Sequence, residues 1–321
     1  MTNTAEQLEP NHDTKSEFAE ALFQGLTSRQ KSIPCRFLYD AKGSQLFEEI
    51  TRQPEYYPTR TEAGILASCA PEIAAVTEEG SVLIEFGSGS STKTEILLLA
   101  LGQKLKTYVP LDISKAALDD ALERLSGRFP QLPITPITAD FSNPIALPAD
   151  MAGRKRIGFF PGSTIGNLVP DEAVTLLSSM RTTLGHDGQL IIGTDLVKPL
   201  DVLVPAYNDT AGVTAAFNLN VLRHANRVIG TDFKLENFRH DAIWNPDKSR
   251  MEMHLISGTE QTITGLSRPV TIAAGEHLHT ENSHKYTIES FHALAAKAGW
   301  EPANVWTDDD KMFAVHALKA V

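Results

Sequence analysis

The sequence is poor in cysteine. Cys35 and Cys69 are the only two cysteines in 321 residues, and they do not form a C-x-x-C pair. This usage argues against a disulfide scaffold and against a zinc site built from cysteines. We therefore expect a protein of the reducing cytoplasm.

Long hydrophobic runs and basic runs are also missing. The longest apolar runs, such as Ile96–Leu101, are too short to span a bilayer, so we expect no membrane segment. The first residues are polar and acidic and lack the pattern of a secretory signal. The net charge of −11 argues against nucleic acid as a partner, because phosphates require a basic surface. We expect a soluble monomer that acts on a small molecule.

From residue 61 onward, hydrophobic patterns typical of strands and helices alternate. Such alternation predicts a mostly parallel, doubly wound α/β sheet of the Rossmann-like kind. The last two strands are joined by a short connection, so we expect an antiparallel hairpin and an antiparallel final strand. Strands are predicted at 81–86, 106–111, 134–138, 156–160, 189–194, 301–307 and 312–318, and helices at 61–76, 92–102, 114–127, 170–184 and 287–298.

A second, inserted lobe is predicted from the region that breaks this alternation. It contains a predicted helix over 200–224 and β-like stretches at 250–256 and 270–272. Upstream, helices are predicted at 16–31 and 44–50, and Pro54 and Pro58 are expected to keep the chain extended or turned. The predicted domains are 61–196 plus 287–321, a lobe of 16–60 plus 197–286, and disorder over 1–15.

A glycine turn follows the first predicted strand, in VLIEFGSGSSTK. Gly87 and Gly89, on either side of Ser88, allow positive φ and close approach of a ligand before the helix at Thr92. Thr92 stands where the nicotinamide fingerprint G-x-G-x-x-G has its third glycine, which weakens a dehydrogenase interpretation. The E-x-G-x-G form resembles the first motif of S-adenosylmethionine enzymes, although a plain strand–turn–helix connection is also compatible.

Three acids are expected at the ends of three successive strands: Glu85, Asp112 and Asp140. Asp112 can accept hydrogen bonds from ribose hydroxyls, or else cap the helix at 114. Asp140 can accept from an adenine amino group while Phe141 packs on the base. Three such acids together favour a nucleoside-containing cofactor.

Histidines at 277, 279 and 284 raise the question of a metal. Their spacing, with no cysteine nearby, favours exposed loop histidines over a metal cluster. We therefore predict no metal.

Several motifs, in order along almost the whole chain, resemble the histidine Nα-methyltransferase family of ergothioneine biosynthesis. They are FLYDAKGSQLFEEIT, PEYYPTRTE, the glycine turn, GSTIGNL, GTDLVK, YNDTAGVTAAFN and TENSHKY. The resemblance implies a class I methyltransferase sheet with a substrate lobe. It also implies S-adenosylmethionine-dependent trimethylation of the α-amine of L-histidine to hercynine.

Site residues follow from this resemblance, position by position. Tyr56 and Asn167 would position the amine, and Asn167 and Tyr207 would hold the carboxylate. Tyr39, Glu281 and Ser283 would bind the imidazole. The remaining matches are Gly162 and Thr164 beside the amine, Phe217 and Met253 lining the substrate, and Gly87, Ser88, Gly89, Lys93, Asp112, Asp140 and Phe141 for the cofactor.

Some positions depart from the family pattern, and other functions remain open. Leu38 stands where an aromatic residue is common, and Asn282, His284 and Tyr286 lie in a variable segment around the matched Glu281 and Ser283. Another amino acid, such as tryptophan or tyrosine, is an alternative substrate, although an acid at 281 favours imidazole over indole. A binding module without transfer activity is the alternative from a different class, and the intact glycine turn and acids argue against it.

Overall fold

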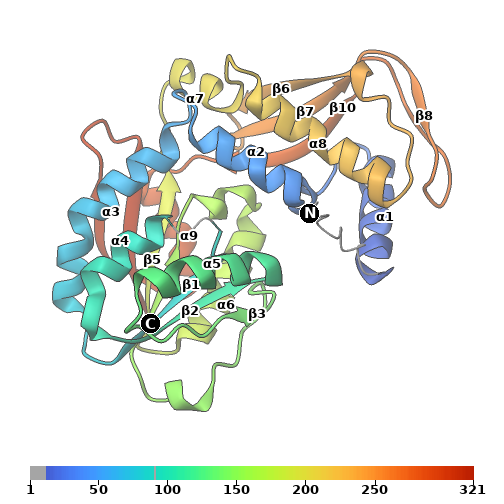
Figure 1. Ribbon diagram of the computed structural model, residues 1–321. Coiled ribbons are helices and arrows are strands. Elements are labelled where there is room, and N and C mark those ends of the chain that lie inside the picture. The colour runs from blue at the N-terminus through green and yellow to red at the C-terminus, as the bar shows by residue number, and fades with distance from the viewer. Residues whose placement is uncertain (1–11, 90–91) are drawn as a thin grey trace. The chain divides into compact units, whose positions relative to one another are not determined.

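The computed structural model describes residues 12–89 and 92–321. Their contacts divide them into two compact units. Unit 1 comprises the described residues up to Tyr56, Leu200–Asp247 and Met251–Asn282, and unit 2 comprises Tyr57–Pro199, Lys248–Arg250 and Ser283–Val321. The helices and strands are labelled in Figure 1. Within the described ranges, no helix is both long and apolar enough to span a membrane.

Unit 2 is built on a seven-stranded sheet in the order β11-β12-β5-β4-β1-β2-β3. The pairs β1–β2, β1–β4, β2–β3 and β4–β5 are parallel, whereas β12 is antiparallel to both β5 and β11. The predicted mostly parallel α/β sheet with an antiparallel final strand is therefore confirmed. The strands are β1 (Ser81–Phe86), β2 (Leu105–Asp112), β3 (Ile137–Thr138), β4 (Arg156–Phe160), β5 (Gln189–Asp195), β11 (Trp300–Thr307) and β12 (Phe313–Ala320).

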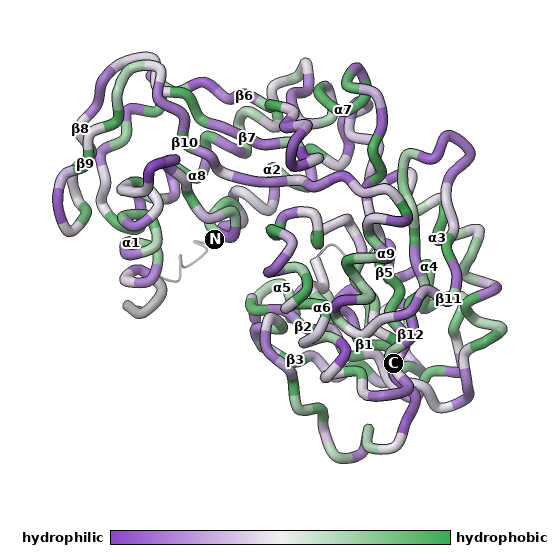
Figure 2. Tube along the Cα trace, turned by 180° about the vertical axis from the view of Figure 1, so that it is seen from behind, coloured by the Kyte–Doolittle hydropathy of each residue, from purple (hydrophilic) through white to green (hydrophobic). Residues whose placement is uncertain are grey.

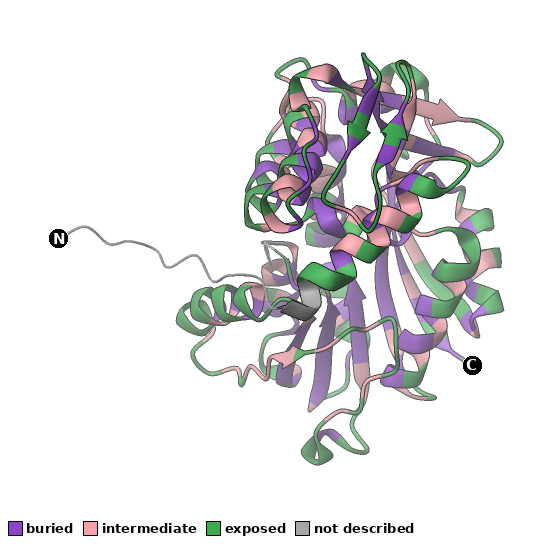
Figure 3. Cartoon of the chain, turned by 90° about the vertical axis from the view of Figure 1, so that its right-hand side faces the viewer, coloured by how far each residue is buried: buried purple, intermediate pink, exposed green. Residues whose placement is uncertain are grey.

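Helices cover both faces of this sheet, as expected for buried parallel strands. The side chains of Val82, Ile84 and Phe86 enter one hydrophobic cluster, and Leu83 enters another on the opposite face. The central strands of the sheet are coloured as buried in Figure 3, whereas most of β11 is not, and hydrophobic stretches can be followed along the chain in Figure 2. The helices of unit 2 are α3 (Tyr57–Val76), α4 (Thr92–Leu101), α5 (Lys115–Arg128), α6 (Pro170–Leu184) and α9 (Ile288–Lys297).

Unit 1 combines helices with two small sheets, one of order β10-β7-β6 and one of β8-β9. Its core contains Phe18, Leu22, Val221 and Leu255, which come from three separate segments of the chain. Its helices are α1 (His12–Thr27), α2 (Ala41–Thr51), α7 (Leu200–Tyr207) and α8 (Val213–Val228). Its strands are β6 (Phe238–Asn245), β7 (Arg250–Ser257), β8 (Gln261–Ile263), β9 (Val270–Ile272) and β10 (His277–His284), although the ends of β7 and β10 belong to unit 2.

The helix predicted over 200–224 is instead two helices. The Asp209 carboxylate accepts hydrogen bonds from the backbone N–H groups of Val213 (2.8 Å) and Thr214 (2.7 Å), which begins α8. Gly212 directly before it has φ +73°, outside the right-handed helical region. A local cap therefore interrupts a pattern that reads as continuous.

Two N-terminal expectations also need correction. Helix α1 begins at His12, so residues 12–15 are helical rather than disordered, whereas residues 1–11 lie outside the described chain. Pro58 lies in the first turn of α3 instead of an extended segment. Proline is tolerated there because the first N–H groups of a helix have no partner within the helix.

Candidate functional site

The glycine turn connects β1 to α4 in unit 2. Gly87 has φ +80° and Gly89 φ +28°, the backbone range that favours glycine. A Cβ atom on Gly87 would stand 3.6 Å from Cζ of Phe141, so that ring lies beside the turn. Ser88 is buried between the two glycines. The turn and Phe141, predicted separately as cofactor contacts, thus come together in space.

The two predicted nucleoside-binding carboxylates are both held by their own loops. Oδ1 of Asp112 accepts from the Ser114 N–H at 2.9 Å, and the helix cap of α5 is Ser114 itself. Oδ1 of Asp140 accepts from the Ser142 N–H at 2.9 Å and also from the Ser142 hydroxyl. Asp140 follows β3 by two residues instead of ending it. Each carboxylate is oriented in advance.

Glu85 differs from these two acids, because it lies inside β1 and is buried. The strand ends one residue later, so Glu85 is not at the strand end as predicted. Its carboxylate accepts from the Thr94 hydroxyl at 2.5 Å and from the Tyr108 hydroxyl. Burial raises the pKa of Glu85 to about 7, although these two hydrogen bonds oppose the rise. Glu85 therefore connects β1 to α4 and to β2.

Glu62 on α3 joins two predicted parts of the site. Its carboxylate pairs with Nζ of Lys93 at 2.6 Å and accepts from the Gly162 N–H at 2.9 and 3.0 Å. Gly193 of β5 makes room for it, since a Cβ atom there would stand 2.0 Å from Oε1 of Glu62. Glu62 was absent from the predicted site. The available signal was its helical spacing from Pro58 and Ile65, which places an acid on the buried face of α3.

The GSTIGN loop follows β4 and carries Gly162, Thr164 and Asn167. Ser163 has φ +53°, and its Oγ accepts from the Asp195 N–H at 2.9 Å. A short 3-10 helix, Thr164–Asn167, comes next. Nδ1 of His284 donates to the Gly166 carbonyl at 2.8 Å. With the bond from Gly162 to Glu62, three anchors fix the loop that ends in Asn167.

In unit 1, the four aromatic residues predicted to contact the substrate belong to one connected cluster of rings. The Tyr39 ring lies 5.3 Å from Phe217, and the Tyr56 ring lies 6.3 Å from Tyr207. Phe47 of α2, which the sequence analysis missed, links the two pairs at 5.6 Å from Tyr39 and 6.3 Å from Tyr56. Five rings from α2, α7, α8 and the adjoining loops thus lie together.

The carboxylate of Glu281 contacts one ring of this aromatic cluster. The Tyr39 hydroxyl donates to Oε1 of Glu281 at 3.2 Å. Met253 is buried on β7, and its backbone carbonyl accepts from the Thr280 hydroxyl at 3.0 Å, next to Glu281 in the sequence. The structure therefore brings together Tyr39, Tyr56, Tyr207, Phe217 and Glu281, while the side chain of Met253 has no described contact with them.

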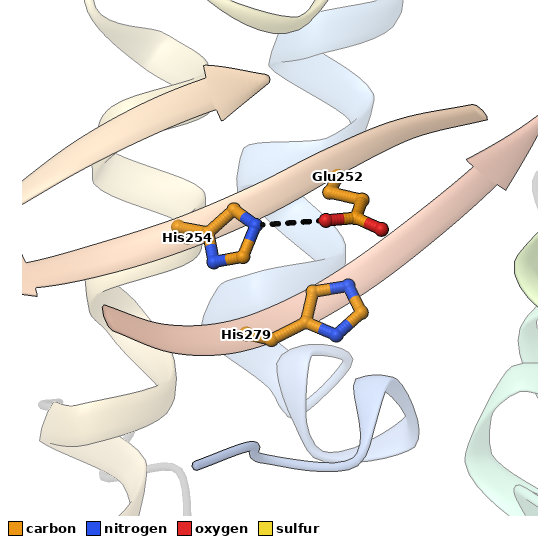
Figure 4. Close-up of side chains that lie close together, drawn as sticks. All are labelled: Glu252, His254 and His279. Atoms are coloured by element: carbon orange, nitrogen blue, oxygen red, sulfur yellow. Dashed lines mark hydrogen bonds and ion pairs between the residues drawn. The ribbon is translucent and has the colours of Figure 1, made fainter. Parts of the chain in front are cut away.

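The histidines predicted as exposed loop residues lie in strand β10 and are at least partly buried. Figure 4 shows Glu252 and His254 on β7 beside His279 on β10, with potential ligand atoms within 4.8 Å of one another. The rings of His254 and His279 are stacked at 24° and 5.0 Å, so their in-plane lone pairs do not converge on one point. The absence of a metal stays a prediction.

The sequence matches the family model described as histidine-specific methyltransferase, SAM-dependent, over residues 18–320. It is 42% identical to the histidine N-alpha-methyltransferase of Mycolicibacterium smegmatis, covering 93% of this chain and 94% of that protein. The enzyme of the same name from Mycobacterium tuberculosis is 38% identical, with 90% of each chain covered. Ergothioneine biosynthesis protein 1 of Neurospora crassa is 30% identical over 90% of this chain but only 33% of its own length.

These matches extend over almost the whole chain. Both mycobacterial relatives are covered over nearly their whole length, and the family model includes both units. The chain therefore belongs to the family of histidine-specific, S-adenosylmethionine-dependent methyltransferases.

Proposed function

We propose that this protein transfers three methyl groups in succession to the α-amine of L-histidine and so produces hercynine. The observation that carries the choice of histidine is the pairing of Glu281 with Tyr39 inside an aromatic cluster. A carboxylate among rings can accept from an imidazole N–H, whereas burying it against an apolar substrate would cost free energy.

The residues around the glycine turn fit S-adenosylmethionine. The positive φ angles of Gly87 and Gly89 allow the backbone to approach a ligand closely, and Phe141 lies beside Gly87. Lys93 would hold the methionine carboxylate, Asp112 the ribose and Asp140 the adenine. When bound, S-adenosylmethionine supplies an electrophilic methyl group on its sulfonium.

The protein's own task is to present a neutral amine. An α-amino group has a pKa of about 8 and is mostly protonated at neutral pH, so a proton must leave before the transfer. The Asn167 amide and the Tyr56 hydroxyl would aim the amine without a full negative charge that would trap the ammonium form. Holding the reactants in this orientation supplies much of the acceleration. Aromatic faces such as those of Tyr56 and Phe217 favour the cation that develops with successive methylations.

The proposal includes a monomeric cytoplasmic enzyme with no resident metal and no nucleic-acid partner. The net charge of −11 supports the last point.

The test is mass spectrometry of the full chain incubated with S-adenosylmethionine and each of the twenty amino acids. We expect histidine alone to accumulate a trimethylated product. Methylation of tryptophan or tyrosine instead would refute the imidazole assignment but keep the cofactor site. Cofactor binding with no product would refute amino-acid methylation altogether.

Glu281→Ala provides the matched residue test. We expect the KM for histidine to rise about 10- to 100-fold, because a hydrogen bond to a charged group contributes roughly 1.5–3 kcal/mol. Glu260→Ala, which removes an exposed acid of the same unit, is the control and should leave the KM unchanged. Equal effects of the two substitutions would contradict the role of Glu281.

A further inference from the structure

A histidine of β6 contacts the end of helix α7 in unit 1. Tyr207 is the last residue of α7, and its backbone carbonyl lies 2.8 Å from Nε2 of His240. The last carbonyl groups of an α-helix have no partner within the helix, and a side-chain donor can satisfy them. His240 therefore caps α7 from a neighbouring strand, at the residue that is proposed to hold the substrate carboxylate.

The partners of the His240 ring define its protonation state. A carbonyl oxygen only accepts, so Nε2 must carry a hydrogen. Nδ1 lies 2.9 Å from the amide nitrogen of Asn218, and the same nitrogen donates to the His254 carbonyl at 3.2 Å. Because this second carbonyl also only accepts, the group of Asn218 beside the ring is its –NH2 group. Nδ1 is therefore the unprotonated acceptor.

Burial supports the same protonation state. Asn218 lies on α8 and is 1% exposed. Burial lowers the pKa of His240 below its usual 6.5, although the hydrogen bond to Tyr207 and the charges of Asp241 and Asp209 oppose this shift. The ring is therefore neutral at pH 7, and its single N–H group is directed at α7 while its lone pair is directed at α8.

The turn that follows Tyr207 is held at two further points. The Asp209 carboxylate caps the start of α8. Thr210 donates to Oε1 of Glu55 through its N–H at 3.3 Å and through its hydroxyl at 2.7 Å. Neither of these contacts involves α7. The hydrogen bond from His240 thus anchors the turn on the side of α7, where Tyr207 lies.

We propose that His240 is a positioning residue for the substrate carboxylate, because its Nε2–H group fixes the end of α7 and with it the place from which Tyr207 reaches the ligand. This inference rests on the proposed function, in which Tyr207 holds the carboxylate of L-histidine. Asn218 keeps the His240 ring in the orientation that this contact requires. Such supporting hydrogen bonds determine how precisely a binding residue is placed.

The test compares two amide side chains at position 240. Glutamine is longer by one methylene group, so His240→Gln can return a donor to the Tyr207 carbonyl, whereas the amide of His240→Asn ends near the place of Nδ1. With S-adenosylhomocysteine bound, calorimetry should show that His240→Asn raises the Kd of L-histidine about three- to tenfold, as the loss of one neutral hydrogen bond implies. His240→Gln should stay within about twofold of wild type, and so should the Kd of S-adenosylhomocysteine in both variants.

A double-mutant cycle with Tyr207→Phe shows whether His240 acts through Tyr207. Tyr207→Phe removes the hydroxyl, keeps the backbone carbonyl and should itself weaken the binding of L-histidine. In this background, His240→Asn should have little further effect. An effect that persists there would mean general damage to unit 1, and equal Kd values for His240→Gln and His240→Asn would mean that the Nε2 contact is unimportant. Either result would overturn the proposal.

If circular dichroism shows that His240→Asn does not fold, Asn218→Ala takes its place, since it removes the group that orients the ring and keeps His240 itself. The Kd of L-histidine should then rise by about threefold or more, and this rise should disappear in the Tyr207→Phe background. No rise, or a rise that persists, would contradict the role of His240.

The same measurements separate this inference from the proposed function. A wild-type protein that does not bind L-histidine would refute the proposed function itself. Unchanged binding by Tyr207→Phe would refute the assignment of Tyr207 and, with it, this inference. Weaker binding by Tyr207→Phe together with wild-type binding by His240→Asn would refute only the role of His240.

Discussion

At the residue scale, the Glu62 carboxylate has an unusual position for an acid, since it is 1% exposed on the inner face of α3. Its partners are a predicted cofactor residue, Lys93, and the N–H of a predicted substrate-loop residue, Gly162. A charge so deeply buried is retained at a cost in desolvation, and its full set of partners compensates for that cost. We infer that Glu62 fixes the position of Lys93 relative to the loop that contains Gly162.

Replacing this acid should change cofactor affinity as well as stability. In Glu62→Gln, an acceptor for the Gly162 N–H remains, but the charge opposite Lys93 is lost. We expect the KM for S-adenosylmethionine to rise by about 10- to 100-fold, because interactions of charged groups contribute roughly 1.5–3 kcal/mol. Steady-state kinetics would measure this change.

The control for this variant is Glu72→Gln on the same helix, whose carboxylate accepts from Nε1 of Trp306 at an exposed position. It should leave the KM unchanged. A Glu62→Gln protein with wild-type kinetics and only a lower melting temperature would show that Glu62 is merely structural.

At the element scale, strand β1 is fully buried and yet contains an acid. The predicted bounds of β1, β4 and α6 agree with the structure because their apolar runs are long and bounded by turn residues. The same pattern did not reveal which groups hold the buried Glu85 carboxylate. Its position depends on hydrogen bonds to Thr94 and Tyr108, which belong to the next helix and the next strand.

Glu85 predicts a specific pH dependence of stability. Its pKa of about 7 in the folded protein lies above the usual 4.5, so the folded state binds this proton more tightly than the unfolded state. The stabilisation is complete at low pH and is lost as pH rises through about 7, which amounts to roughly 3 kcal/mol. Urea unfolding should show that, from pH 5 to pH 8, the free energy of unfolding of the wild type falls by about that amount relative to that of Glu85→Gln.

An exposed acid just before the strand provides the comparison. Glu79→Gln should follow the wild-type pH profile, since its side chain is in water. If Glu85→Gln also follows the wild-type profile, the carboxyl of Glu85 does not titrate in this range.

At the scale of the whole molecule, the proposed cofactor residues belong to one unit and the aromatic cluster proposed to bind histidine belongs to the other. The predicted cofactor residues all belong to unit 2, whereas Tyr39, Tyr56, Tyr207, Phe217 and Glu281 belong to unit 1. Unit 1 itself is assembled from three chain segments. S-adenosylhomocysteine and L-histidine should therefore slow hydrogen exchange at different backbone amides.

Hydrogen exchange measured by mass spectrometry tests this division. S-adenosylhomocysteine alone should slow exchange in unit 2 around Gly87, Asp112 and Asp140, because bound ligand stabilises the state that binds it. Addition of L-histidine should further slow exchange around Tyr39 and Glu281 in unit 1. Histidine protection confined to unit 2 would contradict the assignment of the aromatic cluster.

The sequence by itself determined the alternation of strands and helices, the glycine turn, the acid that ends β2 and the acid that follows β3. These features depend on local patterns, since apolar periodicity and turn residues act over a few positions. It also carried the motifs that place the chain in its family.

Only the tertiary structure decided which side chains work together. Glu62 meets Gly162 across 100 positions of sequence, and Tyr39 meets Glu281 across 242. Such contacts follow from how helices and strands pack, and no local pattern encodes them. The ion pair of Lys285 with Asp195 has the same origin, because the bridge between Leu196, just after β5, and Tyr286, just after β10, brings the two residues together.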